Sequence, residues 1–371
     1  MKTYIISTSP FGNSIPNHFF ELSKNLIAKG NRVVIVFDKN HNPANSNTGI
    51  IYKTWPSTRP TKLKDFIFYY KLCREYNPEI VLGQFGSTNI TLLVGSLLRI
   101  PNRIIYWHTM FIQLKIDSTQ SKITSKLRHW FKKNLLQHFS TLILTNSSAT
   151  KNDLISHYQL TNIRVLNYLI PDPKEAEKIK SKKERDFAIS FVGRLDKSKG
   201  QENLINVLPQ IISIYPNLII YFVGDGTEKK RLELRCIELK IQKNVCFTGS
   251  VSLNEVYDYM AKSLVHISMS AGEAFGLVNA EALAVGTPIL ANKVGGIEDI
   301  LLEGQNGYSL DLEKEGDVIG KLKKIIEGDW STFSKKARKH FEDNFLTSQK
   351  NLTRQLNELE KELLPTDGNS H

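Results

Sequence analysis

The chain has 371 residues, of which 41% are hydrophobic and 23% charged, and its formal net charge is +12. Because one hydrophobic core seldom serves more than about 250 to 300 residues, this length predicts two domains, and the composition excludes collagen, mucin-like and largely disordered proteins. Three cysteines without a C-x-x-C pair exclude a disulfide framework and a thiolate zinc site, and no apolar run is long enough for a signal peptide or a membrane span. We therefore expect a cytoplasmic protein.

Short β-branched runs alternate with longer amphipathic stretches through the first half of the chain. Strands are expected at residues 4–7, 32–37, 79–84, 103–108, 141–146 and 164–168. Helices are expected between them, at about 16–29, 62–76, 89–98, 121–139 and 148–158. Runs that are apolar on both faces, such as residues 33–36, are typical of a parallel sheet covered by helices.

The same alternation resumes after residues 174–185, a charged segment that we expect to be a linker. Strands are expected at 187–192, 218–223, 245–248, 264–268 and 288–291, and helices near 201–214, 228–239, 255–261, 277–285, 314–327, 332–344 and 348–363. This predicts an α/β fold of two doubly wound, Rossmann-like domains, 1–170 and 171–347, that face an interdomain cleft. The last helix, within about 348–371, can pack back on the first domain.

Positive charge is concentrated in the first half of the chain. Residues 1–170 contain 21 basic and 7 acidic residues, whereas residues 171–371 contain 28 and 30. This asymmetry predicts an anionic partner for the first half: a membrane surface, a lipid-linked phosphate or nucleic acid. A solvated basic face without a partner is the alternative.

Residues 268–288 carry the most informative pattern, a strand end followed by a glycine-containing loop and a helix that starts near Gly276. The first amides of that helix have no intrahelical acceptor, which predicts a binding site for an anion such as a diphosphate. Glu273 and Glu281 flank this point, and their carboxylates can accept hydrogen bonds from sugar and ribose hydroxyls. The alternative is that both are solvent-facing acids that favour the helix dipole.

A second stretch, residues 191–200, reads F-V-G-R-L-D-K-S-K-G. Gly193 lets the backbone turn sharply at a strand end, and Arg194 and Lys199 then project cations into the same cleft. A basic surface loop is the alternative.

Together these stretches resemble the large group 1 (family four) retaining glycosyltransferases of the two-domain GT-B architecture. The features that carry the resemblance are G-R-L-x-x-x-K-G at residues 193–200, V-G-x-G at 223–226, F-x-G at 247–249, E-x-F-G-x-x-x-x-E at 273–281, G-x-P at 286–288 and a G-G run with an N-G turn at 295–307. Six features in family order, spread over most of the second domain, make the resemblance specific.

The resemblance implies that residues 1–170 bind the acceptor and residues 171–347 bind the nucleotide sugar. It also implies a role for each matching position. Arg194 and Lys199 would hold the diphosphate, Glu273 would contact the donor sugar, and Glu281 would bind the ribose hydroxyls. His108, at a strand end, would line the reaction centre, with a purely structural histidine as the alternative. The residues implied in binding the nucleotide sugar are Gly12, Gly193, Arg194, Lys199, Glu273, Phe275, Gly276, Leu277, Val278 and Glu281. The loop at residues 9–14 departs from the family by carrying only one glycine, Gly12.

The implied reaction is sugar transfer from a nucleotide-diphosphate sugar, UDP- or GDP-linked, to a glycan or lipid-linked acceptor with retention. No Asp-x-Asp occurs, and Arg194 and Lys199 supply the cations, so we expect no metal and no cofactor. A nucleotide-sugar 2-epimerase of the same fold is one alternative, and a basic nucleic-acid-binding protein, for which no recognisable module is present, is another.

The helix expected at residues 121–139 combines apolar and basic side chains. The apolar ones that can share a face are Ile123, Leu127, Trp130, Phe131 and Leu135, and the basic ones around them are Lys122, Lys126, Arg128, Lys132 and Lys133. Because bacterial relatives commonly build surface polysaccharides on lipid carriers, this helix predicts peripheral binding to the inner face of the cell membrane. A helix that only covers the core is the alternative.

Overall fold

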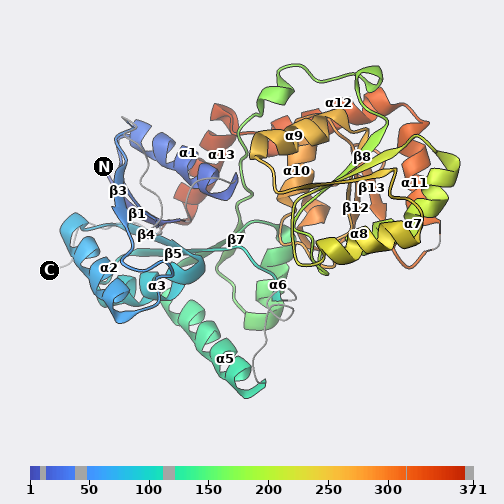
Figure 1. The fold of residues 1–371 in the computed structure, drawn as a ribbon. Helices are drawn as coiled ribbons and strands as arrows, with labels where there is room; N and C mark the ends of the chain where they lie inside the picture. The colour runs from blue at the N-terminus through green and yellow to red at the C-terminus, as the bar shows by residue number, and fades with distance from the viewer. Residues whose placement is uncertain (9–13, 38–47, 112–121, 315, 364–371) are drawn as a thin grey trace. The chain divides into compact units, whose positions relative to one another are not determined.

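The structure is a computed structural model, and it describes residues 1–8, 14–37, 48–111, 122–314 and 316–363. The side chains of residue 14 and of residues 122–128 also lie outside the description. The chain forms two compact units, Met1–Leu169 with Thr347–His371, and Ile170–Leu346 (Figure 1). We call them unit 1 and unit 2.

Unit 1 is built on a parallel sheet of seven strands in the order β3-β2-β1-β4-β5-β6-β7, the doubly wound arrangement. Its strands are β1 (Thr3–Ser7), β2 (Arg32–Phe37), β3 (Ile51–Thr54), β4 (Ile80–Gln84), β5 (Asn102–Trp107), β6 (Leu142–Thr145) and β7 (Ile163–Val165), and its helices are α1 (Ser14–Ala28), α2 (Leu63–Tyr76), α3 (Thr88–Leu97), α5 (Lys122–Phe139), α6 (Ser148–Tyr158) and α13 (Gln349–Glu362). Figure 1 shows α1 and α13 on one face of this sheet and α2 and α3 on the other. The last helix thus packs beside the first.

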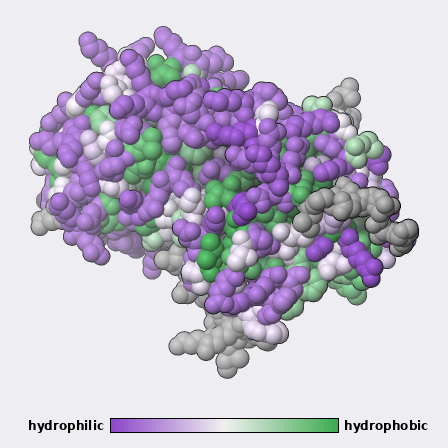
Figure 2. Space-filling view, turned by 180° about the vertical axis from the view of Figure 1, so that it is seen from behind, coloured by the Kyte–Doolittle hydropathy of each residue, from purple (hydrophilic) through white to green (hydrophobic). Residues whose placement is uncertain are grey.

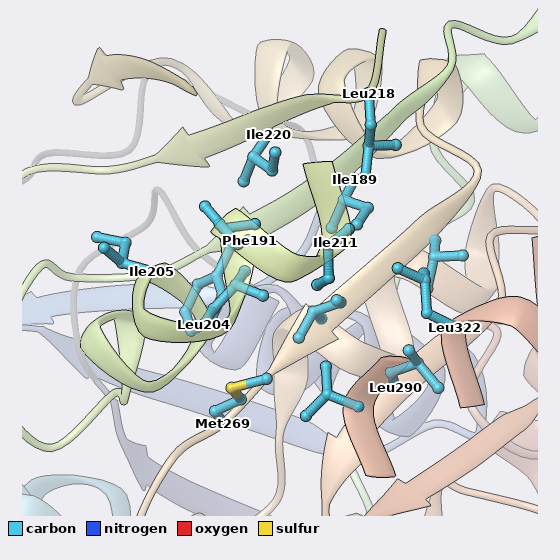
Figure 3. Close-up of a cluster of buried hydrophobic side chains, with 14 of the residues drawn as sticks. Ile189, Phe191, Leu204, Ile205, Ile211, Leu218, Ile220, Met269, Leu290 and Leu322 are labelled. Carbon is cyan, nitrogen blue, oxygen red and sulfur yellow. The ribbon is translucent and has the colours of Figure 1, made fainter. Parts of the chain in front are cut away.

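Unit 2 repeats the design with a six-stranded parallel sheet in the order β10-β9-β8-β11-β12-β13. Its strands are β8 (Ala188–Val192), β9 (Ile219–Val223), β10 (Val245–Gly249), β11 (Val265–Ser268), β12 (Ile289–Asn292) and β13 (Gly307–Leu310), and its helices are α7 (Gln201–Ile214), α8 (Lys229–Glu238), α9 (Leu253–Lys262), α10 (Leu277–Ala284), α11 (Asp317–Ile326) and α12 (Trp330–Asn344). Figure 3 shows its core, where Phe191 of β8, Leu204 of α7 and Leu322 of α11 are buried together.

The predicted fold class is confirmed, and most element bounds agree to within two residues. Strands β3 and β13 were not predicted. Each has only four residues and lies at a sheet edge, and β3 is at most half-buried. Edge strands are short and polar because a long apolar edge would pair with other chains, so they leave little periodicity to detect.

The prediction that residues 174–185 form a linker was wrong, because the whole segment belongs to unit 2. Arg185 anchors it: its guanidinium donates hydrogen bonds to the Val285 carbonyl (2.7 Å), the Ser263 carbonyl (2.9 Å) and the Thr287 hydroxyl (2.6 Å). The same group lies over the ring of Trp330. A buried cation needs such partners, and local composition does not reveal them.

The surface seen in Figure 2 is mainly hydrophilic, with hydrophobic side chains gathered in smaller areas. Among the described residues, no helix is long and apolar enough to cross a membrane.

Candidate active site

The loops that follow strands β8, β9, β11 and β12 meet at one edge of the unit 2 sheet, because parallel strands all end on the same side. Backbone hydrogen bonds join them in pairs. The Leu195 amide donates to the Asp225 carbonyl (2.9 Å), the Ala271 amide to the Ser198 carbonyl (2.9 Å), and the Gly296 amide to the Glu273 carbonyl (2.8 Å). The loops that carry the predicted residues therefore form one hydrogen-bonded surface.

Two glycines of the family-like motifs allow this close packing. A Cβ atom on Gly200, which has a φ of +77°, would lie 2.2 Å from the Met269 carbonyl oxygen. A Cβ atom on Gly226 would lie 2.2 Å from the Leu195 carbonyl oxygen. Any larger residue would push the loops apart, which explains why glycine stands at these points of the motifs.

Helix α10 begins at this surface, with Gly276 as its left-handed N-cap (φ +91°). The amides of Asn279 and Ala280 both bond to the Gly276 carbonyl, at 2.9 and 3.3 Å. No acceptor for the amides of Leu277 and Val278 is found within the described part of the chain. Two free donors at a helix start form a site that favours an anion.

Lys199 and Glu273, predicted from separate motifs, lie together. The Lys199 ammonium donates to the Glu273 carboxylate at 2.8 Å, and the side chains are 26% and 15% exposed. Glu273 precedes the free amides of α10 by only a few residues. The structure thus brings a cation, a carboxylate and a helix start into one small region of unit 2.

Arg194 lies in the same loop as Lys199 but is far more exposed, with 70% of its side chain accessible. Its Nε donates to Asp196, and its carbonyl accepts from the Gln201 amide at 2.9 Å. Burial would raise the pKa of Asp196, but hydrogen bonds from Ser198 and Arg194 outweigh it and lower that pKa. The guanidinium is therefore held at the loop by Asp196 while most of the side chain stays exposed to solvent.

Two of the remaining predicted residues of unit 2, Glu281 and Phe275, are buried. Glu281 is buried in the second turn of α10. Phe275 is also buried, and its ring packs edge-on against Phe345. Sequence reasoning missed Asn279, which is fully buried beside Gly276 with neither amide atom hydrogen-bonded within the described residues. An asparagine in an otherwise apolar helix turn was its one signal.

In unit 1, His108 follows β5 and has a partner for each ring nitrogen. Nε2 lies 2.7 Å from Gln84 Oε1, and Nδ1 is hydrogen-bonded to the Tyr168 hydroxyl. The ring is stacked on Phe85 at a centroid distance of 4.1 Å. Burial, helped by the nearby His18, lowers the pKa of His108 to about 3. His108 is therefore neutral near pH 7 and suited to hydrogen bonding rather than to charge stabilisation.

A cavity of about 1070 Å³ opens beside His108 at the carboxyl edge of the unit 1 sheet. Its lining includes Gln84, Phe85, Trp107 and Lys132, and all of its lining residues belong to unit 1. Of these, only His108 was predicted as a site residue. The predicted Gly12 lies outside the described residues.

Comparisons with known proteins agree with this geometry. A family model described as "Glycosyl transferases group 1" matches residues 172–344, and one described as "Glycosyltransferase Family 4" matches residues 15–168. The chain is 27% identical over 337 residues to the phosphatidylinositol N-acetylglucosaminyltransferase gpi3 subunit of Schizosaccharomyces pombe. The aligned region covers 85% of this chain and 70% of that protein. Several other curated relatives align over 137 to 144 residues only, about a third of their own length.

Solved structures resemble the whole chain. Anabaena Alr3699/HepE in complex with UDP and glucose has a TM-score of 0.73 at 18% identity, covering 98% of this chain and 100% of that one. The apo form of the lipopolysaccharide outer core galactosyltransferase WaaB has a TM-score of 0.72 at 16% identity, with coverages of 98% and 100%. At such identities the likeness shows the fold.

Proposed function

Because the chain belongs to the group 1 glycosyltransferases and has the GT-B fold, we propose that it transfers a sugar from a nucleotide-diphosphate sugar to a glycan or lipid-linked acceptor. The observation that carries the proposal is the pairing of Lys199 with Glu273 beside the free amides of Leu277 and Val278. A cation and two amide donors suit a diphosphate, and a carboxylate next to them suits a sugar hydroxyl.

The reaction breaks the bond between the sugar C1 and the diphosphate oxygen, which keeps the electron pair. The acceptor hydroxyl forms the new bond to C1 and releases its proton, and the nucleoside diphosphate leaves. Negative charge grows on the leaving phosphate, where Arg194, Lys199 and the α10 amides would stabilise it. We further propose that the sugar keeps its anomeric configuration, that Glu281 binds the ribose, and that no metal takes part.

A panel of nucleotide sugars tests the donor. The likeness to the Anabaena protein crystallised with UDP and glucose makes UDP-glucose the first candidate, followed by other UDP- and GDP-linked sugars. We expect one donor to raise the melting temperature and to be hydrolysed slowly without an acceptor. Rapid conversion into an isomeric nucleotide sugar without any acceptor would instead indicate a 2-epimerase.

We also propose that unit 1 meets an anionic membrane at the cytoplasmic face, where bacterial surface polysaccharides are built on lipid carriers. Trp130 and Phe131 of α5 support this, since they are 61% and 48% exposed rather than buried with Leu135. Lys132 and Lys133, however, contact Asn89 and Gln159 within the unit. The expected basic face is therefore smaller than the sequence suggested.

Vesicle flotation tests the membrane proposal. We expect the chain to float with anionic but not neutral lipid at low salt, and to dissociate as salt is added, because charge attraction is screened. Replacing Lys126 and Arg128 with Gln and Trp130 with Ser should reduce flotation. Equal recovery with neutral and anionic vesicles would contradict the proposal.

A further inference from the structure

The charged residues that line the cavity of unit 1 are all basic. The cavity is lined by 19 described residues, which include Lys132 and Arg59 but no aspartate or glutamate. Most of the others carry hydroxyl, amide or aromatic groups. A pocket with two cations and no acid favours a ligand that brings its own negative charge.

Lys132 is the better placed of the two cations. Its ammonium donates to Asn89 Oδ1 at 2.8 Å and lies 5.5 Å from the centre of the Trp107 ring. Neither partner is charged, and no carboxylate pairs with Lys132 among the described residues. The Trp107 indole is fixed in turn, because its N–H donates to the Thr109 carbonyl at 2.6 Å.

An aromatic wall completes the cavity. Phe85 is 48% exposed and has a φ of +51°, a left-handed backbone conformation that is strained for a bulky residue. Local hydrogen bonds hold it there: the Gln84 amide donates to Ser87 Oγ at 3.0 Å, and the Thr88 hydroxyl donates to the Phe85 carbonyl at 3.0 Å. Residues in such conformations are frequent at binding sites, and an exposed ring at a pocket wall can stack on a sugar.

Gln84 adds an unused donor. Its Oε1 accepts from His108 Nε2, while its own amide nitrogen is buried and has no partner within the described residues. Gln84 is 2% exposed and lines the cavity. A buried polar atom without a partner costs free energy, and a ligand oxygen in the cavity could satisfy it.

We propose that Lys132 binds a phosphate or carboxylate group on a ligand in this cavity, next to a sugar ring that stacks on Phe85. Because the resemblance already assigns the acceptor to unit 1, that ligand would be the acceptor. The identification of the ligand as the acceptor rests on the transferase function proposed above. The binding of an anionic sugar in this cavity does not depend on that function. The shared chemistry is a sugar with a negative substituent.

The electrostatics of the free pocket agree with this assignment. Burial lowers the pKa of the Lys132 ammonium to about 8, which means that the charged form costs free energy when no ligand is bound. An anion beside it would offset that cost. Removing the ammonium should therefore weaken anionic ligands and leave neutral ones unchanged.

Calorimetry on the full chain without any nucleotide tests the inference, with glucose, glucose 6-phosphate and glucuronate as probes. We expect one or both anionic sugars to bind at least about tenfold more tightly than glucose, the scale of one hydrogen bond to a charged group. Lys132→Gln should remove this preference and Lys132→Arg should keep it. Lys133→Gln is the matched control, since Lys133 is the next residue of α5 but donates to Gln159 outside the cavity.

Each outcome has a clear meaning. Preference for glucose 6-phosphate over glucuronate identifies a phosphate, and the reverse preference identifies a carboxylate. Equal binding of glucose and both anionic sugars, no binding of any probe at millimolar concentration, or an unchanged preference in Lys132→Gln would overturn the inference. Failure of every nucleotide sugar to bind would overturn the proposed function instead, and it would leave Lys132-dependent binding intact.

Discussion

The two units place their site cations in opposite settings. In unit 2, Lys199 is paired with Glu273, and Arg194 with Asp196, in loops that are partly open to solvent. In unit 1, Lys132 is half-buried, and its ammonium lies beside two uncharged residues, Asn89 and Trp107. A paired cation is stable without a ligand and can exchange partners when a diphosphate arrives and leaves, whereas an unpaired, half-buried cation is stabilised chiefly by the ligand itself.

This contrast predicts that the largest loss of activity follows from removing a unit 2 cation. We expect Lys199→Ala and Arg194→Ala each to lower kcat/KM by about 10² to 10³, because in the proposed mechanism each removes a charge that would stabilise the leaving diphosphate. The measurement is initial rate with the donor that stabilises the chain. Lys197→Ala, an exposed lysine of the same loop, is the control and should keep the wild-type rate. Wild-type rates in both Lys199→Ala and Arg194→Ala would remove these residues from the site.

The second prediction concerns pH and the unit 1 cation. Because the pKa of Lys132 is lowered to about 8, its ammonium in the free pocket loses its charge above that pH, and KM for an anionic acceptor should rise about tenfold by pH 9. Its surroundings are Asn89 and Trp107, with Arg59 and the neutral His108 elsewhere in the lining. Lys132→Arg should flatten the profile, since a guanidinium stays charged. An identical profile in Lys132→Arg would show that another group titrates.

The third prediction identifies a property that the units share. Burial lowers the pKa of His108 in unit 1 and of His266 in unit 2 to about 3. An unfolded histidine takes up a proton near pH 6.5, so below that pH the unfolded state binds more protons and stability falls. Each group contributes up to about 1.4 kcal/mol per pH unit.

Denaturant unfolding at pH 7 and 5.5, followed separately in each unit by hydrogen exchange, measures this effect. His266→Gln is the control, because it removes one of the two groups and should reduce the slope in unit 2 alone. A free energy of unfolding that stays constant between these pH values would mean that the histidines are not buried in neutral form.

The same contrast explains what the sequence could predict. Arg194, Lys199, Glu273 and the start of α10 lie in two short motifs, each following a strand, so the rule that parallel strands end together was enough to place them in one region. The cavity residues Arg59, Gln84, Trp107 and Lys132 come from four distant segments, and no spacing relates them. Lys132 even matched a different pattern, the basic side of an amphipathic helix. Its position in the cavity lining depends on packing against other segments, which the pattern of one helix cannot reveal.

The smallest expected effect is that of a chelator. If Arg194, Lys199 and the α10 amides stabilise the leaving diphosphate, these groups make a bridging metal ion unnecessary, and EDTA should leave the initial rate within about twofold. The measurement needs purified chain, saturating donor and a coupled assay whose own enzymes tolerate EDTA. A rate abolished by EDTA and restored by magnesium or manganese would contradict the assignment. It would mean that the paired cations of unit 2 only position the donor while a metal ion carries the developing charge.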